Sequence, residues 1–225
     1  MKILLVSDTE DGGLWNYYSP DRTRGVDLIL SCGDLDPDYL QFLTTVVNKP
    51  LLYVRGNHDG VYDRRPPLGC EDIDCRVYNY RGLRILGLGG SLKYKDAGDM
   101  YTEAEMARRI RRLSATLLYT RGFDLLLTHA PARGYGDRED LPHRGFVCFN
   151  RLLERWHPAF MAHGHVHKEY GDFQRMITHP CGTTIVNASG TCILDVDAKQ
   201  YPPEGQTGSA FYDWNIRRAL SRHGC

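Results

Sequence analysis

The sequence predicts an α/β fold whose β-sheets are mixed rather than purely parallel. Short apolar runs recur along the chain and are bounded by Gly, Asp, Asn and Pro, a pattern typical of strands buried on both faces. Helical patterns separate several of the early runs, whereas the stretch from Phe160 to Val196 consists mainly of strands and turns. The expected strands are Ile3–Val6, Leu28–Leu30, Leu51–Val54, Ile85–Leu88, Leu125–Leu127, Phe160–Ala162, Thr184–Val186 and Ile193–Val196.

The clearest helix begins at Thr102, because Glu105 lies three residues later and the two side chains can form a capping box. Apolar side chains then recur at helical spacing and define one buried face. The basic run Arg108–Arg112 lies on the same segment, and we interpret it as the solvent-facing side of the helix rather than as a nucleic-acid patch. The apolar face consists of Met106, Ile110, Leu113 and Leu117.

Two further helices are expected over Phe146–Trp156 and Ala210–Leu220. A helix-breaking stretch, Pro202-Pro203-Glu204-Gly205, precedes the second of them. Neither an internal repeat nor a low-complexity linker divides the chain. We therefore expect residues 1–225 to form a single domain.

Composition and charge exclude several classes of protein. The 28 Lys and Arg residues balance the 28 Asp and Glu residues, which argues against a protein that holds nucleic acid mainly by a positive field. No apolar run approaches the roughly 18 residues of a membrane span, and Met1–Asp8 is too short for a signal peptide. The seven cysteines show no C-x-x-C pair and no disulfide-framework spacing, so reduced thiols and a cytoplasmic location are expected.

Side chains with oxygen or imidazole donors follow five of the expected strands. Ligands of open α/β sheets bind at the carboxyl ends of the strands, because loops from different strands converge there. Carboxylate, amide and imidazole groups gathered at one point are the ligand chemistry of divalent transition metals. In an extended segment, the three histidines of the last of these loops would lie on one side. The residues concerned are Asp8, Asp34, Asn57, His58, Asp59, His129, His163, His165 and His167.

The strand-end residues form an ordered series: Asp8, Gly33-Asp34, Gly56-Asn57-His58-Asp59, His129 and Gly164-His165-Val166-His167. This series resembles the calcineurin-like metallophosphoesterase family, and the resemblance extends from residue 3 to about residue 197. It implies a four-layer α-β-β-α sandwich, in which two mixed β-sheets pack face to face between outer helices. It also implies that a hydroxide bridging two divalent metal ions hydrolyses a phosphate ester.

The resemblance further implies a set of metal ligands. Asp34 would bridge the two ions through its two carboxylate oxygens. The remaining ligands would be Asp8 and His167 for the first ion, and Asn57, His129 and His165 for the second.

One position departs from the family pattern. The family usually has Asp-x-His after the first strand, whereas this chain has Asp8-Thr9-Glu10. Glu10 either binds the first ion through a carboxylate oxygen or points into solvent. A carboxylate in place of an imidazole favours harder metals, so Mn²⁺ is the expected ion, with Fe, Zn, Ni and Co as alternatives.

The resemblance implies that His58 assists the leaving group, either as a general acid or by stabilising charge on the leaving oxygen. Asp59 either orients the His58 imidazole or forms an Asx turn. Arg133 and His143 lie in or beyond the loop that follows His129, and we expect them to contact the phosphate of the substrate.

The leading hypothesis is therefore a metal-dependent hydrolase of ester bonds that acts on a small phosphodiester or phosphomonoester. One alternative is a non-catalytic interaction module that keeps the fold. A nuclease is a second alternative, although a neutral chain of this length leaves little room for a basic binding groove. No membrane partner is expected, and the oligomeric state is left open.

Overall fold

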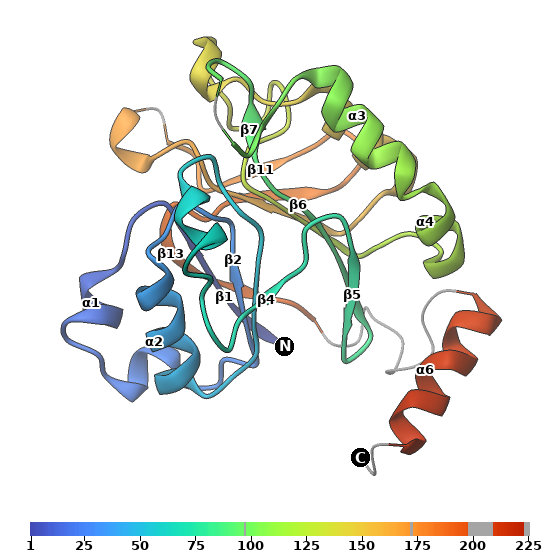
Figure 1. The fold of residues 1–225 in the computed structure, drawn as a ribbon, viewed down its shortest axis with the longest axis horizontal. Helices are drawn as coiled ribbons and strands as arrows, with labels where there is room; N and C mark the ends of the chain where they lie inside the picture. The colour runs from blue at the N-terminus through green and yellow to red at the C-terminus, as the bar shows by residue number, and fades with distance from the viewer. Residues whose placement is uncertain (97, 172, 198–208, 223–225) are drawn as a thin grey trace.

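The computed structural model describes residues 1–96, 98–171, 173–197 and 209–222. Two β-sheets pack face to face, and helices cover both outer sides (Figure 1). The predicted four-layer α-β-β-α sandwich of mixed sheets is therefore confirmed. The helix-breaking stretch that was expected at 202–205 lies outside the described residues.

The first sheet is parallel except at one edge. Its order is β13-β1-β2-β3-β4, and β13 runs antiparallel to β1. Because β1, β2 and β3 are parallel, the loops that follow them leave the sheet at the same end. The strands are β1 (Lys2–Ser7), β2 (Leu28–Ser31), β3 (Leu51–Tyr53), β4 (Glu71–Asp72) and β13 (Gly190–Asp195).

The second sheet has the order β11-β12-β10-β9-β6-β5, with a parallel centre and an antiparallel strand at each edge. A separate parallel pair joins two short strands, β7 and β8. All eight expected strands are present, with small differences at their ends. The strands are β5 (Val77–Tyr80), β6 (Leu83–Leu88), β7 (Ser91–Leu92), β8 (Met100–Tyr101), β9 (Leu125–Thr128), β10 (Phe160–His163), β11 (Met176–Thr178) and β12 (Thr184–Asn187).

Three apolar clusters hold the layers together. The central cluster lies between the sheets and joins inward side chains such as Leu5 of β1 and Leu127 of β9. A second cluster packs the outer face of the first sheet against α1 (Gly12–Trp15) and α2 (Pro37–Val47). The third packs the outer face of the second sheet against α3 (Glu103–Arg112), α4 (Ser114–Thr120) and α5 (Val147–Trp156). Burial on both faces explains why the central strands are continuous apolar runs.

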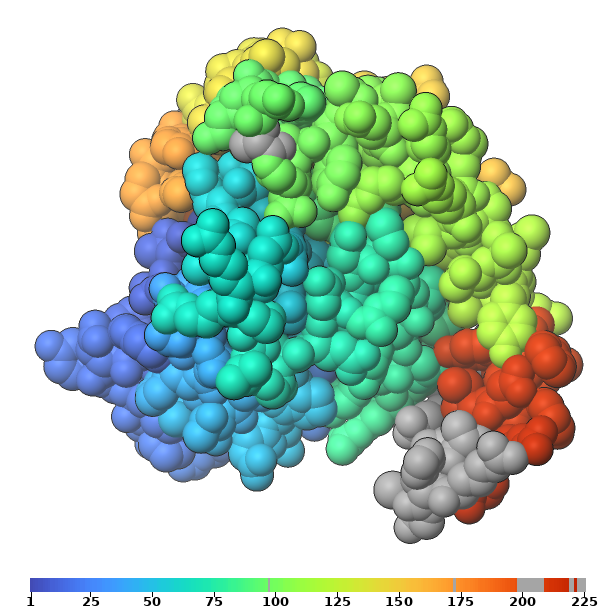
Figure 2. Space-filling view, in the orientation of Figure 1, coloured from blue at the N-terminus to red at the C-terminus, as the bar shows by residue number. Residues whose placement is uncertain are grey.

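The three helices expected from the sequence are present, one of them with a break, and α1 and α2 were not expected. The capping box between Thr102 and Glu105 is present at the start of α3. The expected helix through Leu117 is divided at Leu113, which ends α3 and precedes α4, although the predicted apolar face still packs toward the sheet. The last helix, α6 (Ala210–Arg222), forms an edge of the molecule beside α4 (Figures 1 and 2).

Two further expectations concern the whole chain. The cysteines in the described residues are all free, as predicted. Of the helices that the structure describes, none has both the length and the apolar character needed to cross a bilayer.

Candidate metal centre

A pocket of about 290 Å³ lies where the strand-end loops of the two sheets meet. Backbone bonds join these loops: the Asp8 amide donates to the Gly33 carbonyl, and the Gly164 amide donates to the His129 carbonyl. These bonds join neighbouring loops within each sheet, and the backbone N–H of His165, which donates to the Asp8 carboxylate, joins the loops of the two sheets. Its lining residues are Asp8, Asp34, Asn57, His58, Tyr94, Pro142, His143, His165, His167 and Tyr170.

His129 lies at the centre of the donor group; its side chain is fully buried and does not itself line the pocket, whereas its neighbours Asp34, Asn57 and His165 do. Its Nε2 atom is 3.3 Å from Oδ2 of Asp34, 3.0 Å from Oδ1 of Asn57 and 3.1 Å from Nδ1 of His165. Among the described residues, Asp34, His129 and His165 form the one group of three or more potential metal-binding side chains with closely spaced donor atoms.

Backbone carbonyls fix the orientation of both imidazoles. Nδ1 of His129 lies 2.8 Å from the carbonyl oxygen of Cys32, and Nε2 of His165 lies 2.6 Å from that of Pro142. Because a carbonyl can only accept, each of these ring nitrogens must carry the hydrogen. The opposite nitrogens of the neutral rings therefore direct lone pairs toward the point shared with Asp34. Metal-binding histidines are commonly oriented in this way.

The charges of this group are strongly coupled. Although burial opposes ionisation, His129 lowers the pKa of Asp34 well below its ordinary value. Burial likewise opposes the charged form of His129, but the Asp34 carboxylate raises the pKa of that imidazole to about 9. Burial and the adjacent charge of His129 lower the pKa of His165 to about 3. His129 is therefore the one positively charged group here, and the side chains around its Nε2 atom all present lone pairs to it.

The residues present fit a divalent metal ion. The carbonyl oxygen of Asn57 faces the shared point, and its amide Nδ2 has no hydrogen-bond partner within the described chain although it is buried. A carboxylate, an amide oxygen and two imidazole nitrogens are suitable ligands for Mn, Fe or Zn. Apart from His129, nothing in this group supplies a positive charge.

The proposed ligands of the first ion lie at the adjacent wall. The buried carboxylate of Asp8 accepts the backbone N–H of His165 at distances of 2.9 and 3.1 Å. Burial raises its pKa. Nε2 of His167 is 3.7 Å from Oδ1 of Asp8, and its ring stacks on Tyr170. The structure thus places Asp8 and His167 together, but outside the compact group around His129.

Three of the site residues have left-handed backbone conformations. The φ angles are 63° at Asp8, 55° at Asp34 and 68° at His165. The expectation that the histidines after β10 share one side of an extended segment is wrong, because the chain turns at His165. His163 instead donates from Nδ1 to the Gly164 carbonyl, and burial lowers its pKa to about 4. Left-handed backbone conformations such as those at Asp8, Asp34 and His165 are uncommon for residues other than glycine and are often found at functional sites.

Two glycines allow the loops to approach closely. A Cβ atom on Gly56 would lie 2.6 Å from Cγ of Asp34 and 2.7 Å from Cε1 of His129. A Cβ atom on Gly164 would lie 2.6 Å from Oδ2 of Asp8. A side chain at either position would therefore displace a candidate ligand.

The two expected catalytic residues have different environments. The His58 side chain is exposed and lines the pocket, and its backbone N–H donates to Oδ1 of Asp34 at 2.8 Å. The buried carboxylate of Asp59 accepts the backbone N–H groups of Gly56 and Asp34, both at 2.8 Å. Burial, together with the charge of Asp34, raises the pKa of Asp59 to about 6. Asp59 thus supports the loop backbone rather than the His58 imidazole.

The two expected substrate residues also separate. His143 lines the pocket, and its Nδ1 is 2.5 Å from Oδ2 of Asp140. Arg133 forms ion pairs with Asp137 at 2.7 Å and with Glu139 at 2.6 Å, and it does not line the pocket. Because both acids lie in the same loop, they compete with any phosphate for this guanidinium group.

Glu10 is exposed and is not among the residues that line the pocket. Conversely, sequence reasoning did not identify Tyr94, Pro142 or Tyr170 as pocket residues. Pro142 precedes His143 directly, and Tyr170 lies three residues beyond His167, so position relative to a candidate residue was the available signal. Tyr94 lies beyond β7 and carried no such signal.

A mixed double-sheet sandwich with carboxylate, amide and imidazole donors at its strand ends defines an α/β protein with a candidate metal site. The chain belongs to the calcineurin-like phosphoesterase superfamily, whose domain model matches residues 1–199. A crystal structure of Vps29 from Chaetomium thermophilum is similar to it at 15% sequence identity, covering 87% of this chain and 82% of that chain with a TM-score of 0.41. No curated protein sequence matches the chain.

Proposed function

We propose that this protein is a metal-dependent phosphoesterase that hydrolyses a small phosphodiester or phosphomonoester. The observation that carries the proposal is the convergence of lone pairs from Asp34, Asn57 and His165 on Nε2 of His129. Membership in the phosphoesterase superfamily supports the same reaction class. A pocket of about 290 Å³ suits a small ester rather than a polymer.

The ligand assignment in this proposal follows the two walls of the pocket. Asp34, Asn57, His129 and His165 would hold one ion. Asp8 and His167 would contribute to a second ion that shares Asp34. A divalent cation bound by such residues neutralises phosphate oxygens and lowers the pKa of water. Oxygen donors are prominent in this set, which favours Mn²⁺.

The chain's own residues would orient the substrate and move protons. His58 projects from the rim, where its imidazole can give a proton to the leaving oxygen. Asp140 orients His143 by accepting from Nδ1, so that Nε2, when it is also protonated, would donate to a phosphate oxygen in the pocket. Asp59 holds the backbones of Gly56 and Asp34 in place, so it preserves the geometry of the donors.

A second candidate function is a non-catalytic interaction module that binds at most one ion. Two observations favour it: Glu10 is exposed, and Asp8 and His167 lie outside the compact donor group. A module of this kind would keep the His129 group but would lack turnover. Metal content and hydrolysis must therefore be measured on the same preparation.

The decisive experiment incubates the purified protein with Mn²⁺ and bis-p-nitrophenyl phosphate, and separately with p-nitrophenyl phosphate. We expect hydrolysis that a chelator abolishes. Metal binding without turnover across Mn, Fe, Co, Ni and Zn would reject the enzymatic proposal and support the interaction module.

The role of His58 has its own test. His58→Ala should keep its metal but lose about a hundredfold in rate on an alkyl phosphodiester, whose leaving group needs a proton. The loss should be much smaller with p-nitrophenolate as the leaving group. His157→Ala, at the exposed end of α5, is the matched control. Equal losses on both substrates would contradict proton donation by His58.

A further inference from the structure

A second pocket, of about 260 Å³, lies on the outer side of the second sheet. The helices α3 and α4 form one wall and α5 forms the other. Its floor is apolar: Leu117 and Leu152 are buried, and Ile110 and Trp156 are half-buried. We call this pocket the α3–α5 groove. Its lining residues are Ala107, Ile110, Arg111, Ser114, Leu117, Cys148, Arg151, Leu152, Arg155 and Trp156.

Exposed arginines surround this apolar floor. Arg111 stands on α3, and Arg151 and Arg155 stand one helical turn apart on α5. In the described part of the chain, none of the three forms an ion pair with an acidic side chain. In contrast, two partly buried arginines of β6 and α3 are paired: Arg84 with Asp124 at 2.6 Å and Arg109 with Asp74 at 2.5 Å.

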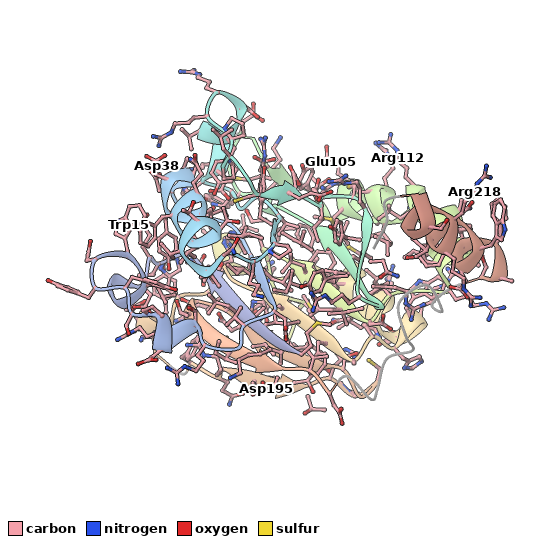
Figure 3. All side chains as sticks on the ribbon, turned by 90° about the horizontal axis from the view of Figure 1, so that it is seen from below. Trp15, Asp38, Glu105, Arg112, Asp195 and Arg218 are labelled. Atoms are coloured by element: carbon pink, nitrogen blue, oxygen red, sulfur yellow. The ribbon has the colours of Figure 1, made fainter. Side chains whose placement is uncertain are left out.

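The positive surface continues along α3. Arg108 and Arg112 are also exposed, and within the described residues neither forms an ion pair, although the charge of Arg108 helps to lower the pKa of Glu105 on the same helix. Figure 3 shows Arg112 projecting away from the body of the molecule. The basic run noted in the sequence is thus more than the solvated face of a helix, because part of it borders an apolar groove. Clustered cations of this kind repel one another until an anionic partner neutralises them.

A contact between α3 and α5 fixes the relative position of the two walls of the groove. The Glu103 carboxylate, in the first turn of α3, accepts the backbone N–H groups of Val147 and Cys148 at 3.1 and 2.6 Å. These are the first two residues of α5, so the amino ends of both helices are joined. A preformed groove loses little conformational freedom on binding.

We propose that the α3–α5 groove docks a short amphipathic segment of a partner protein, with an apolar anchor on the floor and Asp or Glu side chains against Arg111, Arg151 and Arg155. Charge complementarity selects the acidic flanks, and the apolar floor selects a peptide with a bulky anchor. A groove between two helices is a common seat for an amphipathic helix. Nucleic acid fits less well, because the apolar floor has no group that could bind the phosphates of a nucleic acid. The chain also has no net positive charge. The inference does not depend on phosphoesterase activity.

The test selects a phage-displayed library of random peptides on the full-length protein and measures the affinity of the enriched peptides. We expect enriched sequences to combine an aromatic or aliphatic anchor with flanking Asp or Glu. Arg151→Glu should weaken the enriched peptide about tenfold or more, because it places like charges together. Lys49→Glu is the matched control: it makes the same charge change just beyond α2, on the opposite outer layer, and should leave the affinity unchanged.

A second variant tests the floor of the groove. Ile110→Ser changes a half-buried side chain at the edge of the core, and it should weaken the peptide while circular dichroism remains native. Enriched peptides without acidic residues, or with equal affinity for the Arg151→Glu protein, would overturn the proposal. A failure to enrich any peptide would also overturn it. So would Arg151-dependent binding of poly(uridylic acid) tighter than that of the peptide, which would assign the surface to nucleic acid.

Discussion

Backbone carbonyls determine the chemistry of the two central imidazoles. Cys32 and Pro142 each take up the N–H of one ring, so His129 and His165 present their remaining nitrogens to the same point as Asp34. Without a cation, His129 must carry a proton there, in agreement with its pKa of about 9. Metal ions and protons therefore compete for Nε2 of His129, and metal uptake should release a proton.

Removal of a single donor from this group should weaken metal binding. We expect Asn57→Ala and His165→Ala to raise the dissociation constant for Mn²⁺ about tenfold or more, since loss even of an outer partner commonly costs that much. Isothermal titration calorimetry and elemental analysis measure the effect. His157→Ala, which changes an exposed histidine at the end of α5, should bind as the unmodified protein does. Full metal content in both donor variants would show that the ion is held elsewhere.

Glu10 provides a second test at the residue scale. Its side chain is exposed and outside the pocket lining, so we expect Glu10→Gln to leave the metal stoichiometry and affinity unchanged. Elemental analysis after dialysis against Mn²⁺ gives the answer. A loss of one equivalent of metal would instead place Glu10 among the ligands of the first ion.

The sequence identified most of the residues that gather at the pocket, because strand ends of parallel sheets converge whatever the details of their loops. It did not show that Arg133 would pair with Asp137 and Glu139, since ion pairing within a loop depends on how the loop turns. Nor did it show the left-handed backbone at His165, or that Nδ1 of His163 would donate to the Gly164 carbonyl.

At the scale of elements, the loop after β3 is fitted tightly against its neighbours. We expect Gly56→Ala to reduce metal affinity and to lower the free energy of unfolding by about 1–3 kcal/mol, because its Cβ atom would overlap Asp34 and His129. Calorimetric titration and urea denaturation measure the two effects.

The same loop contains a suitable control. Gly60 has no atom within 4 Å of the position that its Cβ would occupy, and it lies in the short 3₁₀ turn Asp59–Asp63. Gly60→Ala should therefore change neither quantity. Similar behaviour of the two variants would mean that the loop can relax around a methyl group.

Elements with strong local signals were predicted well. The capping box starts α3 where Thr102 and Glu105 placed it, and the buried runs became strands. Two of the elements that were not predicted, β5 and α2, were missed for different reasons. The edge strand β5 (Val77–Tyr80) is only half-buried and mixes Tyr with Asn, so its pattern is weak. The helix α2 had a start signal in Asp36-Pro37, which the sequence reasoning did not use.

At the scale of the whole molecule, two buried histidines, His163 and His165, make the stability of the fold sensitive to acid because they are neutral in the folded chain. Burial lowers the pKa of His163 to about 4 and, with the charge of His129, that of His165 to about 3, against an ordinary value of 6.5. The unfolded chain therefore binds protons at higher pH than the folded chain does. Stability from these groups is complete above pH 6.5 and is lost progressively as the pH falls toward 4.

We expect His163 alone to remove on the order of 3 kcal/mol of free energy of unfolding from the metal-free protein between pH 6.5 and pH 4. The raised pKa of Asp59 acts with the opposite sign below about pH 6, so the contribution of His163 is read as the difference between the protein and its His163 variant. Urea denaturation at a series of pH values measures the slope. His163→Gln should flatten the slope, whereas His157→Gln should keep it. An unchanged slope in the His163 variant would show that this imidazole does not control the acid sensitivity.

The left-handed turns at Asp8, Asp34 and His165 have a consequence for attempts to make the protein more thermostable. If only the conformational energy of the backbone is considered, glycine is the favoured residue at each of these three positions. Engineering guided only by unfolding temperature would thus be drawn to remove two carboxylates and an imidazole, and it would yield a sturdier protein with an inert cleft.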